Sequence, residues 1–179
     1  DTITVLRGDQ SAVSMSVTSA SVAVRSPGYA ISNTGASNSV FDVGSGGTLT
    51  LDAKSVTSTV DGFAAISTSH ASAILDVKAK TVSATGADAS AINVAIAGVT
   101  RFDVDVVTSS GYDAVILGPG VHTGRLGRVA STFNDPDSNG LEIAGGTLVD
   151  LTLGSVSATG GTSCIVTSNF TGVAVLRGG

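Results

Sequence analysis

Residues 75–86 read Leu-Asp-Val-Lys-Ala-Lys-Thr-Val-Ser-Ala-Thr-Gly, and the end of this stretch returns later in the chain. Val82-Ser-Ala-Thr-Gly86 is repeated as Val156-Ser-Ala-Thr-Gly160 and, more loosely, as Val107-Thr-Ser-Ser-Gly111. Self-similarity of this kind indicates a repeat architecture, in which each repeat forms one unit that stacks on its neighbours. We therefore expect a solenoid.

The repeat extends in both directions from these copies. The repeat valines are Val56, Val82, Val107, Val129 and Val156. An isoleucine strand is expected after each of them, at Ile66, Ile92, Ile116, Ile143 and Ile165. The same frame pairs Val22 with Ile31 in an earlier coil and leaves residues 40–43 as an extra excursion. The period then drifts between about 22 and 27 residues, which suits strands in register joined by loops of variable length.

Within each repeat, apolar and polar residues alternate with a period of two, as in a strand with one buried face. Two inward columns precede the valine: Leu51, Val77, Phe102, Gly124 and Leu151, and then Ala53, Ala79, Val104, Leu126 and Leu153. Between them lies an outward column, Asp52, Lys78, Asp103, Arg125 and Thr152. A second outward column is Thr50, Asp76, Arg101, Thr123 and Asp150. Equivalent residues of successive coils stack about 4.8 Å apart, so unlike charges should form stabilising ladders.

Composition limits the class of partner. The net charge of −5 and the pI near 4.6 argue against nucleic acid, which needs a clustered basic face. No apolar run is long enough for a transmembrane helix, so membrane insertion is not expected. Cys164 is the only cysteine and is expected to be a small buried side chain, without a disulfide.

The alternating coils, the V-S-x-T-G corners and the outward ladder resemble the pectin-lyase-like right-handed β-helix superfamily. Within that superfamily, the Ser/Thr/Gly/Val-rich and aromatic-poor composition looks most like bacteriophage tail fibres, tailspikes and head fibres. The resemblance implies a homotrimer on the virion surface that contacts other virion proteins and a host surface glycan.

We therefore expect an all-β, single-stranded, right-handed parallel β-helix of about seven coils. It should form one domain over residues 1–179, with irregular N-terminal coils in 1–50 and regular coils in 51–179. Val5-Leu6-Arg7-Gly8 matches Val175-Leu176-Arg177-Gly178, so both are expected at the same position of a coil. A start at Asp1 rather than Met is compatible with a fragment of a longer chain.

Two pairs of carboxylates are candidates for chemistry on a glycosidic bond: Asp103 with Asp105, and Asp76 with Asp150. Such chemistry needs carboxyls about 5–9.5 Å apart, and residues two apart on one strand face are separated by about 6.6 Å. Asp103, however, falls between two cations of the ladder, so we interpret these carboxylates as structural and expect no catalytic residue. His70 and His122 are expected at exposed turn positions without a catalytic or metal-binding role.

The segment Asp135-Pro-Asp137-Ser-Asn139-Gly140 reproduces the D-x-D-x-N-G opening of a calcium loop. Asp135, Asp137 and Asn139 are therefore candidate calcium ligands, and no other cofactor is expected. Against this interpretation, Gly146 stands where the bidentate Glu of such a loop belongs. A plain Asx-rich loop would have the same composition.

These features favour a non-enzymatic structural and attachment module of a phage fibre or spike, which contacts host cell-surface polysaccharide. One alternative is a polysaccharide hydrolase or lyase, which would release new reducing ends. Another is a secreted bacterial adhesin or autotransporter passenger, with an extracellular or bacterial cell-surface location. Fold alone does not decide among them.

Overall fold

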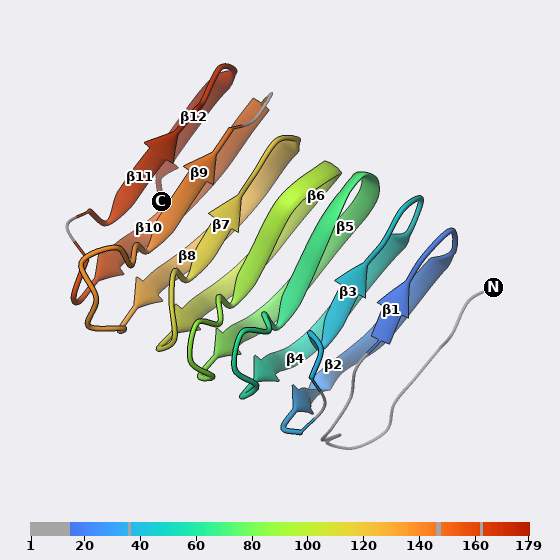
Figure 1. Cartoon of the computed structure of the whole chain (residues 1–179). Coiled ribbons are helices and arrows are strands. Elements are labelled where there is room, and N and C mark those ends of the chain that lie inside the picture. Colours follow the sequence, from blue (N-terminus) through green and yellow to red (C-terminus); the bar gives the residue numbers. More distant parts are fainter. Residues whose placement is uncertain (1–14, 36, 146–147, 162) are drawn as a thin grey trace.

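A computed structural model describes residues 15–35, 37–145, 148–161 and 163–179 (Figure 1). Within these ranges all regular structure is β-strand, and every strand pairing is parallel. The strands are β1 (Met15–Val17), β2 (Ser21–Asn33), β3 (Phe41–Val43), β4 (Thr48–Ser58), β5 (Ile66–Ala84), β6 (Ile92–Ser109), β7 (Val115–Leu117), β8 (Val121–Ser131), β9 (Leu141–Ala144), β10 (Leu148–Ala158), β11 (Ile165–Ser168) and β12 (Val173–Gly178). The chain is all-β, as the sequence predicts.

The strands form a parallel β-solenoid of about six turns (Figure 1). One stack runs in the order β1-β3-β5-β6-β7-β9-β11. The second stack runs β2-β4-β5-β6-β8-β10-β12, so the long strands β5 and β6 contribute to both. The predicted solenoid is confirmed, with about six turns against the predicted seven. The segment Val5-Leu6-Arg7-Gly8, which supported the seventh coil, lies outside the described residues.

The second stack has the register that the repeat predicts. The repeat valines are Cα partners coil by coil, and both inward columns are in register with them. Their side chains form the core: Leu51 is 1% exposed and Leu126 is 0% exposed. Gly124 is the one residue of these two columns that has no side chain. Its φ is +115°, and a Cβ there would collide with the backbone of Phe102 on the neighbouring strand, so this position requires glycine.

The corner glycines of the repeat lie where successive coils come closest. A Cβ at Gly86 would collide with the carbonyl of Val60, and a Cβ at Gly111 would collide with the carbonyl of Gly86. The glycine that ends the V-S-x-T-G stretch is therefore required by the stacking of corners, which explains why it returns with the repeat.

The isoleucine column differs from the prediction. The column in the first stack is Phe41, Ile66, Ile92, Val115, Leu141 and Ile165. Ile116 pairs with Glu142, one residue beyond the column, and Ile143 pairs with Leu117, two residues beyond it. The placements of Ile116 and Ile143 are wrong because loops of different lengths join the valine strand to this one.

The placement of Ile31 is also wrong. Ile31 pairs with Val56 and so holds the repeat-valine position, and β3 pairs with the start of β5 as a regular strand rather than an excursion. The cause is a bulge in β2, where the register shifts between Ser26 and Ala30. The bulge inserts two residues beyond those of the partner strand and hides the period.

The last coil leaves apolar side chains exposed. Ile165, Val173 and Leu176 are 38%, 59% and 38% exposed, because no further coil of the described chain covers them. Cys164 lies in this coil and is exposed. Its prediction as a buried side chain is therefore wrong.

Candidate binding groove

The outward ladder lies on the second stack, on the face opposite the core. In order along the stack, its members are Arg25, Asp52, Lys78, Asp103, Arg125, Thr152 and Arg177. The five predicted members are in the predicted order, and one arginine is added at each end. The second outward column, from Thr50 to Asp150, is also in the predicted register.

Arg125 holds two carboxylates at once. Its Nε and Nη2 lie 3.2 Å from Asp103 Oδ1, and its Nη2 also donates to Asp105 Oδ1. The hydrogen bond with Asp105 is the main cause of a raised Arg125 pKa. All three side chains are about half exposed, so these ion pairs contribute little to stability. Both carboxylates of this pair are therefore engaged by one protein guanidinium.

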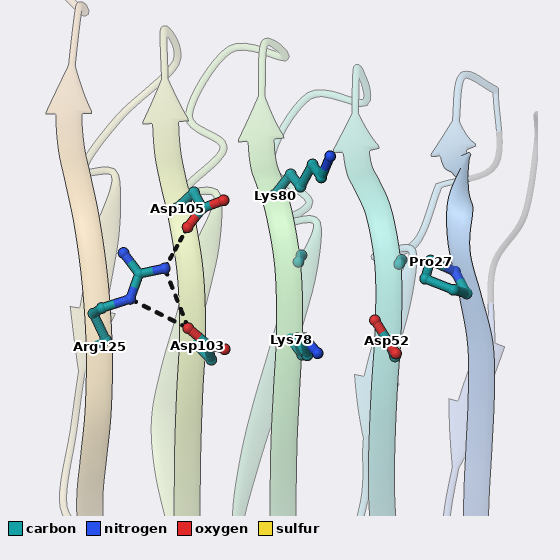
Figure 2. Close-up of a pocket in the computed structure, with 9 residues that line it drawn as sticks. Pro27, Asp52, Lys78, Lys80, Asp103, Asp105 and Arg125 are labelled. Carbon is teal, nitrogen blue, oxygen red and sulfur yellow. Dashed lines mark hydrogen bonds and ion pairs between the residues drawn. The ribbon is translucent and has the colours of Figure 1, made fainter.

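A groove of about 300 Å³ opens around this network (Figure 2). Its lining is Pro27, Asp52, Ala53, Lys78, Ala79, Lys80, Asp103, Asp105 and Arg125. These residues belong to β2, β4, β5, β6 and β8, which are neighbours in the second stack. Figure 2 shows Arg125 at one end of the groove and Pro27 at the other. The groove therefore crosses five coils on paired strands, which position side chains more reproducibly than loops do.

Gly127 leaves room beside the Arg125 guanidinium. Lys54, Lys80, Asp105 and Gly127 occupy equivalent positions of successive coils. A Cβ at Gly127 would collide with the carbonyl of Asp105 and would lie 3.2 Å from Arg125 Nη1. The absence of a side chain at Gly127 lets the guanidinium reach across to Asp105.

The second carboxylate pair is not brought together. Arg101 and Thr123 lie between Asp76 and Asp150 in the column, so the two acids are three coils apart, about 14 Å. Asp150 forms an ion pair with Arg177 instead. Asp76 and Asp150 therefore cannot act on one glycosidic bond.

Asp135, Asp137 and Asn139 lie together in the loop between β8 and β9. The Asp137 N–H donates to Asp135 Oδ1 at 2.9 Å, and Asn139 Nδ2 donates to the Asp137 carbonyl at 3.0 Å. The loop is thus an Asx-type turn that binds its own backbone. Among the described residues, no cluster of three or more His, Cys, Asp or Glu side chains is placed to hold a metal ion. Calcium binding by this loop stays a prediction.

Asp113, which the sequence patterns did not single out, is a fully buried carboxyl at 0% exposed. Its Oδ1 accepts hydrogen bonds from the N–H and the side-chain amide of Asn139. Its Oδ2 is buried and has no donor. Burial raises the pKa of Asp113 to about 6, and Glu142 on the next coil also raises it, while Asn139 lowers it. The raised pKa favours the neutral acid, which spares the unpartnered Oδ2 a buried negative charge.

His122 is buried, at 0% exposed, so its prediction as an exposed turn residue is wrong. Its Nε2 lies 2.7 Å from the Gly118 carbonyl, and its Nδ1 lies 2.8 Å from the Thr100 hydroxyl. Because a carbonyl only accepts, the ring proton is on Nε2, and Nδ1 accepts from Thr100. Burial lowers the His122 pKa, which favours a neutral ring in the core. His70 is exposed as predicted, but it lies within β5.

No protein-family model matches the chain, and neither does any curated protein or solved structure. In the part of the chain that the structure describes, no helix is long and apolar enough to cross a membrane. The fold is that of a parallel β-solenoid, consistent with the β-helix superfamily.

Proposed function

We propose that this chain is a non-enzymatic attachment module whose groove binds polysaccharide on a host cell surface. The observation that carries the proposal is the groove itself, where cations and carboxylates project from successive coils at a fixed spacing. Sugar hydroxyls donate hydrogen bonds to carboxylates and accept them from ammonium and guanidinium groups. A polysaccharide is a repeating ligand, and the stacked coils offer it a repeating surface.

The setting that fits this role is a fibre or spike of a bacteriophage virion, with the chain at the virion surface as a homotrimer beside other virion proteins. A solenoid presents a long, rigid face to a cell surface. Ile74 and Ile96 are 36% and 38% exposed and supply apolar surface for contacts between copies. Neighbouring tail and capsid genes would support this setting, whereas an encoded secretion signal would support a bacterial adhesin.

A polysaccharide hydrolase or lyase is the competing function. The non-enzymatic proposal is supported by Arg125, which binds both carboxylates of the closest candidate pair. Asp103 and Asp105 are therefore occupied by a protein cation rather than poised as an acid and a base.

Purified capsular polysaccharides and lipopolysaccharides from a panel of bacteria test the proposal. We expect the chain to retain at least one of them without releasing new reducing ends. Arg125→Gln should weaken this binding roughly tenfold, because it removes a donor and frees two carboxylates that it orients. Arg177→Gln removes the same charge from an ion pair with Asp150 outside the groove lining, so it is the matched control and should leave binding unchanged.

Two results would contradict the proposal. Retention of no polysaccharide, or equal weakening by both arginine variants, would remove the groove as the binding surface. New reducing ends that disappear in an Asp103→Asn/Asp105→Asn variant would assign the hydrolase or lyase function instead.

A further inference from the structure

Charge is unevenly distributed over this acidic chain. The outward face of β2, β4, β5, β6 and β8 around the groove, here called the cationic strip, carries Arg25, Lys54, Lys78, Lys80, Arg125 and Arg128. Its carboxylates are Asp52, Asp103 and Asp105. All three lysines of the chain lie in the strip, which has a local excess of three positive charges although the net charge is −5. Such a segregated patch attracts an anionic ligand.

None of the three lysines forms an ion pair with a described residue, although Lys78 lies between Asp52 and Asp103 in the ladder. Lys54 and Lys80 occupy equivalent positions of adjacent coils, an unfavourable arrangement for like charges. Asp105, which follows Lys80 in the column, binds Arg125. Figure 2 shows Lys80 extending away from Asp105, toward the strand that carries Lys54. Within the described residues, neither lysine forms an ion pair.

The bulge of β2 forms the wall of the groove next to these lysines. Ser26 pairs with Ala53 and Ala30 with Ser55, so residues 27–29 lie opposite Lys54. Pro27 lines the groove, and Tyr29 in the same bulge is 42% exposed. An exposed aromatic ring beside hydrogen-bonding groups is suited to the apolar face of a sugar ring.

We propose that the cationic strip recognises a saccharide whose units carry carboxylate or sulfate groups, with one such group bound between Lys54 and Lys80. This inference rests on the proposed attachment function and names its ligand class. A nucleic acid fits less well, because the three carboxylates of the strip and the net charge of −5 repel a continuous phosphate backbone. The same carboxylates can accept hydrogen bonds from sugar hydroxyls.

Three forms of one polysaccharide test this inference: carboxyl-reduced chondroitin, which is neutral, chondroitin, which carries carboxylates, and chondroitin sulfate, which carries both groups. Calorimetric titration of the full chain should show affinity rising in that order, with the increase lost at high salt. Lys54→Gln/Lys80→Gln should reduce affinity for the two charged forms about tenfold and leave the neutral form unchanged. Arg101→Gln/Arg177→Gln removes two exposed cations that do not belong to the cationic strip and is the matched control, expected to change nothing.

Equal affinity for the neutral and charged forms, or equal losses in the two double variants, would overturn the inference and leave the attachment function standing. Tighter binding of duplex DNA than of chondroitin sulfate at equal charge concentration would overturn the saccharide assignment. Absence of binding to all three forms would also overturn it, and the bacterial panel would then decide the attachment function separately. The four substituted cations are exposed, and unchanged thermal midpoints would show that the variants fold.

Discussion

Asp113→Asn is expected to stabilise the protein by up to about 3 kcal/mol at pH 8 and to have no effect below about pH 4. The pKa of Asp113 is raised from 3.8 to about 6, mainly by burial, so the neutral acid is the form that suits the folded state. An acid whose pKa is raised on folding stabilises the folded state fully below pH 3.8. This stabilisation is lost as the pH rises through about 6. Asparagine mimics the neutral acid: its Oδ1 can accept from Asn139, and its Nδ2 puts an uncharged group in the place of the unpartnered Oδ2.

Urea unfolding of the two proteins at pH 4, 6 and 8 measures this difference. His122 acts in the opposite direction, because a lowered pKa costs stability as the pH falls below 6.5, but it is present in both proteins and cancels. Asp113→Ala is the control: it removes the charge but also the acceptor for Asn139, so it should be less stable than the Asn variant at every pH. A difference in unfolding free energy between wild type and Asp113→Asn that does not change with pH would contradict the raised pKa of Asp113.

Gly111→Ala is expected to destabilise the protein by about 3 kcal/mol, whereas Gly28→Ala should change stability by less than about 0.5 kcal/mol. A Cβ at Gly111 would collide with the Gly86 carbonyl and would lie 3.0 Å from the Ala89 nitrogen, so two coils would have to separate. A Cβ at Gly28 would have no heavy atom within 4 Å beyond its chain neighbours, which makes this glycine the matched control. Denaturant unfolding at one pH measures the free energy of unfolding of both variants. Equal losses in Gly111→Ala and Gly28→Ala would contradict the close stacking of corners.

The register of the second stack could be predicted because the spacing within its strands is nearly constant. In each regular repeat the same number of residues separates the first inward column from the repeat valine, as between Leu51 and Val56. Counting back from the valine therefore identifies the inward residues correctly. The first stack could not be placed by counting, because corner loops vary in length. Val115 and Ile116 are both apolar, so the alternation of apolar and polar residues does not indicate which of the two points into the core.

The buried positions of His122 and Asp113 differ in how far they could be predicted from the sequence. Extending the inward columns by two residues would give Leu49, Leu75, Thr100, His122 and Val149. That step would have indicated a buried His122 paired with Thr100. Asp113 was harder to find, because it aligns with Asn139 only once the corner lengths are known. The contact of Arg125 with Asp105 is diagonal between coils and depends on side-chain conformation, which the ladder does not specify.

The coil register underlies both the fold and the groove, because it is what gathers charges from five coils on one face. Asp52→Cys/Lys78→Cys in a Cys164→Ser background tests it most directly. Partners on adjacent strands lie about 4.8 Å apart, within the range that a disulfide spans, whereas Asp52 and Asp76 are about 8 Å apart. We predict that mild oxidation cross-links Asp52→Cys/Lys78→Cys, seen as faster migration on a non-reducing gel, and leaves Asp52→Cys/Asp76→Cys open. Cross-linking of the second pair in preference to the first would contradict the stacked ladder and the groove built on it.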